Sequence, residues 1–502
     1  MSQPPHPDRL TRSSLGAEYL DHVARRGAAP ADLIAEAAAS DLLSVAYRGR
    51  FLPAPVFISA AERTRLADDL GTLYALLTDL PNRLFGGDLA ALARGVGMNE
   101  HQTSVVCRAA ATGAPLVPLA RSDLYRDEDG FRLLELNITS ALGGFENADI
   151  CRAMLHHPAL AEFAEAHGLD HPDTIRTIRD ALFAECAAFL PEGRRPVVAL
   201  TDWPESFRTY EPRLRVWAAL LERLGVDAVP CHVGQIRARG DRLEVGGRTV
   251  DIVFRFFLVE EIATAQDAEL VEPVLRAVER GGVGMFSRLD AELYGNKGAL
   301  AMLSDDRHRD AFNAAELACV DRFLPWTRPV RRMVADGDGG ELPLLPYAVR
   351  EQQELILKPT LLHGGSGVVA GWTVDAARWR AHLDEALDGP YVLQRRVHPM
   401  AERFPGAPGA APEELYLNWG VFYADPAVAG GDGYAGCIIR GSLDPQVGVV
   451  SMGGGARVGC CLHEPAPVSA PGPASASAAT SRSAVPPVRV PAGMSDSAHG
   501  AK

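Results

Sequence analysis

The stretch LARSDLYRDEDGFRLLELNITS, residues 119–140, constrains the fold most, because it has the pattern of two strands joined by an acidic turn that ends in glycine. Successive side chains of a strand point to opposite faces. Arg121 and Asp123 therefore share one face of the first strand. Glu135 and Asn137 share one face of the second. If the hairpin pairs Asp123 with Glu135, two carboxylates, an amide oxygen and a guanidinium converge on one surface.

Oxygen atoms of this kind are the ligands that Mg²⁺ prefers, usually a few from the protein and the rest from phosphate and water. The alternative is an exposed hairpin whose acidic face is solvated. Leu133, Leu134 and Leu136 favour a strand that lies in a core, where a carboxylate needs a cation. The pattern therefore indicates a magnesium site.

The composition is that of a globular protein large enough for two or three packed subdomains, with 502 residues, 47% of them hydrophobic and 23% charged. The net charge of -14 and the lack of a Lys/Arg cluster argue against a nucleic-acid partner. No run of about 18 apolar residues predicts a transmembrane helix. The first residues, MSQPPHPDRLTRSS, lack the apolar middle of a signal peptide. We therefore expect no membrane partner.

The eight cysteines are scattered without a CxxC pair, which argues against a structural zinc site and against a disulfide framework. This pattern favours a reducing, cytoplasmic location. The adjacent Cys460 and Cys461 are interpreted as small buried residues, with a redox role as the alternative.

Between residues 196 and 284, predicted strands alternate with predicted helices, which favours right-handed crossovers and a parallel sheet. A short hairpin is expected around Gly246 and Gly247. No GxGxxG follows the first strand, so a dinucleotide site is not supported. Arg208 and Arg255 lie near strand ends and are candidates for contacts to an anionic substrate. Surface ion pairs are the alternative for both.

Gly143 and Gly144 precede a predicted helix that starts near Glu146. Adjacent glycines before a helix allow backbone N–H groups to approach a carboxylate or a phosphate. A plain turn explains the pair equally well.

Two lysines follow the hairpin in positions that suit phosphate binding. Lys297 opens a helical run after Gly295 and Asn296, and Lys358 ends an apolar strand in LILKPTLLHGGSGVVAGW. In the loop after that strand, glycines without Cβ allow N–H groups to close on phosphate oxygens. A glycine-rich turn without a ligand is the alternative, and the loop is not a Walker A sequence. Its candidate ligands are Gly364, Gly365, Ser366 and Gly367.

The chain resembles the glutathionylspermidine synthetase family over roughly residues 118–459. The resemblance is carried by three segments in this order: the acidic hairpin, the Asn296-Lys297 segment, and the Lys-Pro strand with its glycine-rich loop. The resemblance implies an ATP-grasp fold with permuted motif order, in which the nucleotide-binding lysines follow the acidic hairpin. It also implies ATP and Mg²⁺ as cofactors. The implied roles are Mg²⁺ binding by Asp123, Glu135 and Asn137, phosphate binding by Lys297 and Lys358, charge stabilisation by Arg121, and a place beside adenine for Gln394. For Arg440, a phosphate contact and a cross-strand ion pair are alternatives.

We therefore expect the α/β (α+β) class, with an ATP-grasp core, a Rossmann-like subdomain and an N-terminal helical region. The expected regions are a disordered N-terminus at 1–15, a helical cap at 16–117, the metal-binding hairpin and helices of the core at 118–195, a Rossmann-like substrate subdomain at 196–284, ATP-binding subdomains at 285–464, and a disordered Pro/Ala/Ser-rich tail at 465–502.

The resemblance implies an ATP-dependent carboxylate–amine ligase that forms an amide bond through an acyl phosphate and releases ADP and phosphate. Its partners would be a small-molecule or peptide carboxylate and an amine. Two alternatives stay open: a small-molecule kinase that uses the same ATP site, and a non-catalytic relative that binds a nucleotide. The sequence sets neither the identity of the substrates nor the oligomeric state.

Overall fold

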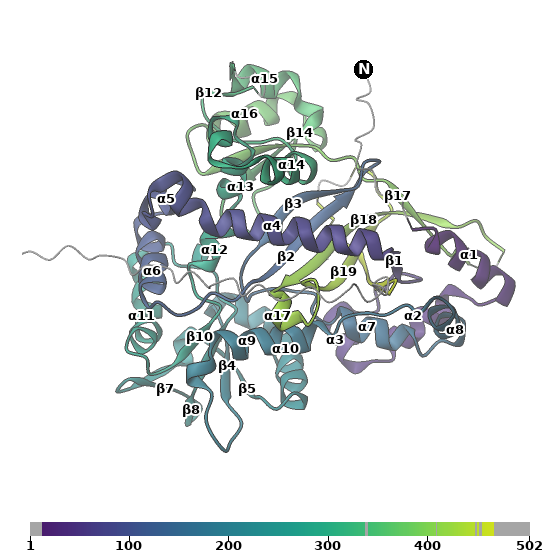
Figure 1. The fold of residues 1–502 in the computed structure, drawn as a ribbon, viewed down its shortest axis with the longest axis horizontal. Helices are drawn as coiled ribbons and strands as arrows, with labels where there is room; N and C mark the ends of the chain where they lie inside the picture. Colours follow the sequence, from purple (N-terminus) through teal and green to yellow (C-terminus); the bar gives the residue numbers. More distant parts are fainter. Residues whose placement is uncertain (1–12, 337–339, 408, 447–448, 451–453, 466–502) are drawn as a thin grey trace, which may run out of the picture. The chain divides into compact units, whose positions relative to one another are not determined.

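The computed structural model describes residues 13–336, 340–407, 409–446, 449–450 and 454–465. Residues 1–12 of the expected N-terminal disorder and residues 466–502 of the expected tail lie outside the described residues. Within this part the fold is mixed α/β and contains the expected helical N-terminal region and Rossmann-like subdomain (Figure 1). No helix in the described ranges is long and apolar enough to cross a membrane.

The N-terminal region forms a run of helices: α1 (Leu15–Arg26), α2 (Pro30–Ala38), α3 (Asp41–Tyr47), α4 (Ala60–Phe85), α5 (Leu89–Gly95) and α6 (Glu100–Ala111). Helix α4 begins at a capping box, in which Ser59 and Glu62 each bind the other's backbone N–H. One element was not expected from the sequence. The short apolar strand β1 (Val56–Ile58) pairs in parallel with β20 (Arg457–His463) at the other end of the described chain. A run of three apolar residues is too short to signal a strand by its periodicity.

The main sheet has the strand order β1-β20-β19-β18-β2-β3, and β17 also pairs with β18. Its other strands are β2 (Leu119–Arg126), β3 (Phe131–Asn137), β17 (Ala401–Phe404), β18 (Glu413–Ala424) and β19 (Tyr434–Ser442). The predicted hairpin is confirmed as β2–β3, and its register pairs Asp123 with Glu135 and Arg121 with Asn137. Helix α4 lies across this sheet and contacts β18 and β19 (Figure 1). Three helices follow the hairpin: α7 (Asn147–Met154), α8 (Pro158–His167) and α9 (Thr174–Glu185).

The Rossmann-like subdomain has a parallel sheet of order β10-β9-β4-β5. Its elements are β4 (Val197–Asp202), α10 (Pro204–Arg223), β5 (Asp227–His232), β9 (Ile252–Arg255), α11 (Ala265–Glu279) and β10 (Gly284–Phe286). The predicted hairpin is present in a small antiparallel sheet of β6 (Arg237–Arg239), β7 (Arg242–Val245) and β8 (Arg248–Val250). Helix α10 begins with Pro204 in its first turn, where the missing N–H costs nothing, and it contains Pro212 further along.

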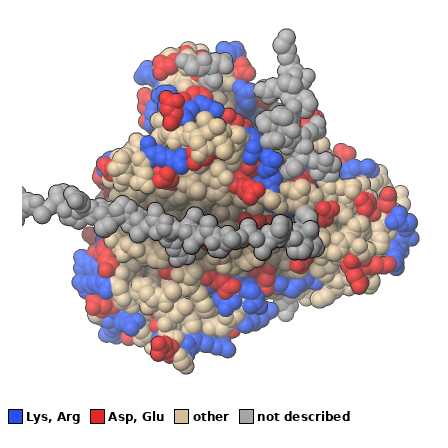
Figure 2. Space-filling view, viewed as in Figure 1, with Lys and Arg blue, Asp and Glu red and all other residues tan. Residues whose placement is uncertain are grey.

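The lysine-bearing part has its own antiparallel sheet, of order β11-β16-β14-β15, and its own hydrophobic core around Trp379. The strands are β11 (Thr327–Pro329), β14 (Leu355–Pro359), β15 (Val369–Ala370) and β16 (Tyr391–Arg395). The helices are α12 (Ala291–Tyr294), α13 (Lys297–Ser304), α14 (Ala314–Phe323), α15 (Leu344–Arg350) and α16 (Ala376–Ala386). Strands β12 (Met333–Ala335) and β13 (Glu341–Pro343) form a separate pair, and α17 (Pro426–Ala429) joins β18 to β19. On the face shown in Figure 2, basic and acidic side chains are interspersed.

Candidate functional site

The carboxylate of Asp123 lies between two guanidinium groups on the face of the main sheet. Its Oδ1 accepts a hydrogen bond from Nε of Arg121 at 3.1 Å and another from Nη2 of Arg440 at 2.8 Å. Asp123 is buried, so both bonds lie where water screens them little. Of the two alternatives for Arg440, the structure shows the cross-strand ion pair. The guanidinium of Arg440 therefore contacts the hairpin directly.

Glu135 lies opposite Asp123 and is surrounded by positive charge. Its Oε2 is 3.2 Å from Nζ of Lys297. Burial by itself raises the pKa of the Glu135 carboxyl, but the charges of Lys297 and Lys358 outweigh burial and hold this pKa well below its usual range. Asn137 is buried beside it and donates from Nδ2 to the backbone oxygen of Arg121 at 3.2 Å. The three predicted metal ligands thus lie together on one hairpin.

Lys358 reaches from β14 to the hairpin on the main sheet. Its Nζ donates to the backbone oxygen of Leu134 at 3.0 Å and to Oε1 of Gln394 at 2.6 Å. Burial lowers the pKa of the Lys358 ammonium to about 8, although the charge of Glu135 acts to raise it. Gln394 uses its other polar atom, Nε2, to donate to Thr327. Both polar ends of Gln394 are therefore bonded within the protein, and in this structure its amide orients Lys358.

The glycine-rich loop is held at the residues that precede its glycines. Gly364, Gly365 and Gly367 have φ angles of 65°, 81° and 68°, which side chains with a Cβ rarely adopt. Before the glycines, Lys297 donates from Nζ to the backbone oxygen of Leu362 at 2.9 Å. His363 Nδ1 lies 2.7 Å from Oε2 of Glu260, which belongs to the Rossmann-like subdomain. The loop is thus held in place by elements from two other parts of the chain.

One pocket joins several of these groups, although Arg121, Asn137 and Lys297 do not line it. It encloses about 630 Å³, a volume that includes the open solvent at its mouth. Polar lining comes from both sheets: Asp123, Glu135, Asn418 and Arg440 from the main sheet, and Lys358 and Gln394 from the lysine-bearing sheet. Apolar lining includes Ile356, Val368, Trp372 and Val397, and the glycine-rich loop contributes Gly365. Gly364, Ser366 and Gly367 belong to the same loop but do not line this pocket.

Two polar atoms in this pocket have no hydrogen-bond partner among the described residues. They are Oδ1 of Asn418 and Nε of Arg440, and both atoms are buried. These residues are directly paired on β18 and β19. An unpaired buried acceptor and an unpaired buried donor are costly. The sequence analysis missed Asn418, because an asparagine in the middle of a long strand carries no signal of its own.

The donor set fits Mg²⁺ held jointly with phosphates. No group of three or more His, Cys, Asp and Glu side chains able to hold a metal ion occurs in the described ranges. Mg²⁺ needs fewer protein ligands, because it usually takes one or two carboxylates and completes its shell with phosphate and water oxygens. Asp123 and Glu135 are two such carboxylates, and the unpaired Oδ1 of Asn418 is a further oxygen of the right kind. The unpaired Nε of Arg440 suits a phosphate oxygen.

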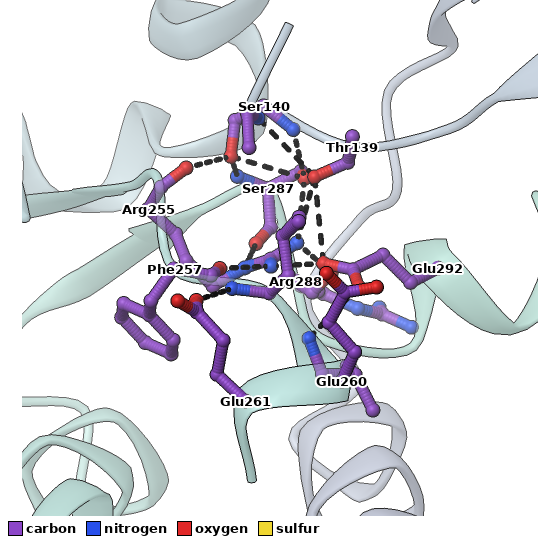
Figure 3. A network of polar contacts seen from close by, with 12 residues as sticks. Thr139, Ser140, Arg255, Phe257, Glu260, Glu261, Ser287, Arg288 and Glu292 are labelled. Atoms are coloured by element: carbon purple, nitrogen blue, oxygen red, sulfur yellow. Dashed lines mark hydrogen bonds and ion pairs between the residues drawn. The ribbon is translucent and has the colours of Figure 1, made fainter. Parts of the chain in front are cut away.

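Arg255, a candidate for substrate contact, lies in a buried polar network instead (Figure 3). Its guanidinium forms an ion pair with Glu292 and donates to the backbone oxygens of Ser287 and Phe257 at 2.9 and 2.7 Å. Ser140, three residues after Asn137, donates to the backbone oxygen of Arg255 at 2.6 Å. The network therefore fixes the end of the hairpin to the Rossmann-like subdomain. Arg208 is exposed on α10 and does not line the pocket.

Comparison with solved structures gives remote likenesses. No protein-family model matches the sequence, and no curated protein matches it. A glutathione synthetase-like effector from Globodera pallida in its apo form is 12% identical, with 92% of this chain and 96% of that chain covered and a TM-score of 0.45. A putative gamma-glutamylcysteine synthetase from Methylobacillus flagellatus is also 12% identical, with 78% and 84% covered and a TM-score of 0.38. Neither structure is described as a glutathionylspermidine synthetase, so that family assignment stays a prediction from the sequence.

Proposed function

We propose that this chain is an ATP-dependent carboxylate–amine ligase that forms an amide bond and releases ADP and phosphate. One observation carries the proposal: Asp123 and Glu135 on one sheet face Lys358 on another across a single pocket. Carboxylates that hold Mg²⁺ and a lysine that binds phosphate are the groups that a magnesium–nucleotide complex needs from a protein.

The charge balance of the site supports a polyanionic ligand. The cations Arg121, Arg440, Lys297 and Lys358 surround the carboxylates Asp123 and Glu135. This excess of positive charge in a partly buried site suits a triphosphate. The apolar lining from Ile356, Val368 and Trp372 suits a planar ring at the other end of the same ligand.

Each residue has a defined part in the proposed site. Asp123, Glu135, Asn137 and Asn418 would hold Mg²⁺, which when bound would neutralise charge on the triphosphate. Lys358 and Lys297 would bind phosphate oxygens, with the N–H groups of the glycine-rich loop closing on them. Gln394 and the backbone of Leu134 hold the Lys358 ammonium in position.

In the proposed reaction, an oxygen of the substrate carboxylate attacks the γ-phosphorus of ATP, and ADP leaves. The amine nitrogen then attacks the acyl carbon, the bond from that carbon to the phosphate oxygen breaks, and the nitrogen loses a proton. Arg121, which donates to Asp123, would stabilise the negative charge that develops on the acyl oxygen. Holding both substrates beside the nucleotide would supply the advantage of proximity.

The partners in this proposal are a small-molecule or peptide carboxylate and an amine. ATP chemistry does not fix the substrates, because one fold hosts many of them. The test is therefore release of ADP and phosphate by the purified full chain with ATP and Mg²⁺, given pooled carboxylates with and without pooled amines. Asp123→Asn removes a charge at the site, and Asp129→Asn is a matched control at the exposed turn of the same hairpin.

Amine-dependent ADP release that yields a product of amide mass, absent in Asp123→Asn and retained in Asp129→Asn, is the expected result. ADP release without amine and with a phosphorylated product would assign a kinase instead. Failure of the wild-type chain to bind magnesium–ATP in calorimetry would overturn the nucleotide site itself.

A further inference from the structure

The two carboxylates of the proposed metal site already have positively charged partners. Oδ1 of Asp123 accepts from Nε of Arg121 at 3.1 Å and from Nη2 of Arg440 at 2.8 Å, and its Oδ2 accepts from Nη2 of Arg121 at 3.5 Å. Oε2 of Glu135 lies 3.2 Å from Nζ of Lys297. Because Mg²⁺ gives up its water shell reluctantly, a carboxylate that must first lose its own partner is a poor ligand for the free ion.

The net charge of the site is positive. The charged groups that line the pocket are two carboxylates and four cations: Asp123, Glu135, Lys358, Arg395, Arg396 and Arg440. Arg395 and Arg396 donate to neutral oxygen atoms of other side chains. Arg121 and Lys297, which are paired with the two carboxylates, bring the number of cations to six. An excess of this size repels a free divalent cation and attracts a polyanion.

Lys297 contacts Glu135 from a fixed position. Its Nζ also donates to the backbone oxygen of Leu362 at 2.9 Å, and its side chain is only 6% exposed. An ammonium has three N–H donors, so these two contacts leave one donor for a further acceptor. A phosphate oxygen that binds there competes with Glu135 for the same positive charge and weakens the ion pair. Phosphate beside Lys297 therefore makes Glu135 more available to a cation.

We propose that the site binds a polyphosphate first and without a divalent cation, and that Lys297 keeps Glu135 from binding a free cation until the phosphate is present. The identity of this polyphosphate as that of ATP rests on the proposed function. Arg440 supports the same order, because its unpaired buried Nε offers a donor to phosphate while its Nη2 stays bonded to Asp123. With phosphate oxygens in place, the excess of positive charge falls, and the carboxylates and the phosphate can share one cation.

The test measures the binding of two probes separately to the purified full chain. Mn²⁺, a paramagnetic substitute for Mg²⁺, is followed by the electron paramagnetic resonance signal of the free ion, and tripolyphosphate is followed by calorimetry with a chelator present. Because the chain has a net charge of -14 and can bind cations elsewhere, Mn²⁺ at the site is defined as the part that Glu135→Gln removes. Lys297→Met removes the ammonium. Arg378→Met removes the same charge from a side chain on α16 that is 77% exposed, and it is the matched control.

With the wild-type chain we expect saturable binding of tripolyphosphate without metal, and no Mn²⁺ binding that depends on Glu135 up to about 1 mM. Lys297→Met should gain a Mn²⁺ ion that the double variant Lys297→Met, Glu135→Gln does not bind. It should also lose affinity for tripolyphosphate by about tenfold or more, because a charged donor is missing. Arg378→Met should bind both probes as the wild-type chain does.

Two results with the wild-type chain would overturn the proposal, whether or not the variants fold: Mn²⁺ binding that Glu135→Gln removes, or tripolyphosphate binding that requires a divalent cation. A folded Lys297→Met chain that gains no Mn²⁺ would refute the part assigned to Lys297. If magnesium–ATP binds but metal-free tripolyphosphate does not, the order of binding is wrong and the nucleotide site stands. If neither binds, the nucleotide site itself is wrong.

Discussion

Replacing Lys358 with methionine removes a buried positive charge that lowers the free energy of unfolding. The Lys358 ammonium is buried, and burial lowers its pKa from 10.5 to about 8 even though Glu135 acts in the opposite direction. A shift of this size corresponds to about 3 kcal/mol of unfavourable free energy for the charged form in the folded state, at about 1.4 kcal/mol per pKa unit.

The sign of the pH dependence follows from the direction of this shift. Below pH 8 the lysine is charged in both the folded and the unfolded chain, and the folded state carries the full cost. Between pH 8 and 10.5 the unfolded chain keeps the proton that the folded chain has lost, so the free energy of unfolding rises with pH. Wild type should therefore gain about 3 kcal/mol relative to Lys358→Met across this interval.

Two measurements check this prediction. Lysine occurs only at positions 297, 358 and 502, so selective ¹³C labelling at Cε gives three signals, and Lys358→Met assigns one of them by its loss. That signal should titrate near pH 8. Urea unfolding of wild type and Lys358→Met from pH 7 to 10 should show that the difference between their free energies of unfolding changes with pH. The difference between Lys358→Arg and Lys358→Met should stay constant, because neither replacement residue titrates in this interval. A Lys358 signal that titrates near 10.5 would refute the reasoning, because the buried charge would then cost nothing.

Four further outcomes are expected. Glu135→Ala should abolish most magnesium-dependent turnover while the circular dichroism spectrum stays unchanged, and near-normal turnover would remove this residue from the metal site. Arg121→Ala should lower the single-turnover rate more than the affinity for ATP, whereas a loss confined to ATP affinity would place this arginine in the nucleotide site. Asn418→Ala should weaken magnesium–ATP binding in calorimetry by about tenfold, because it removes the unpaired oxygen of the pocket. Arg255→Met should destabilise the chain by about 3–5 kcal/mol in urea unfolding, since it leaves the buried Glu292 carboxylate without its counter-charge, and a second change, Glu292→Met, should recover part of this loss.

Local patterns predicted the hairpin well. Its two strands and its turn were expected from the alternation of residues 119–140, whereas the pairing of Asp123 with Glu135 was only a condition. Counting back from the turn, Leu124 pairs with Leu133, and a register shift between Leu124 and Asp123 then brings Asp123 opposite Glu135. The strand that carries Lys358 and the loop that follows it were expected for similar reasons, since an apolar strand and a run of glycines are each visible within a few residues.

Other predictions about the site depended on contacts that no local pattern contains. The resemblance implied a place beside adenine for Gln394, and this role stays a prediction; in the structure its amide binds Lys358 and Thr327. Arg255 was a candidate for substrate contact from its place at a strand end, yet its guanidinium is bound within the protein. In both cases the side chain is bonded to residues from other elements, whose positions the sequence does not reveal.

The sequence by itself determined which groups are candidates for the proposed chemistry, namely two carboxylates on one hairpin and two lysines that follow it in the chain. The tertiary structure decided which of them meet and what surrounds them. It brings Asn418 and Arg440 from β18 and β19 beside the hairpin, and joins β1 to β20. It also buries Lys358 and so lowers its pKa. These features come from packing between segments that are far apart in the chain. The periodicity of a sequence predicts only local structure, because it depends on residues that are close together along the chain.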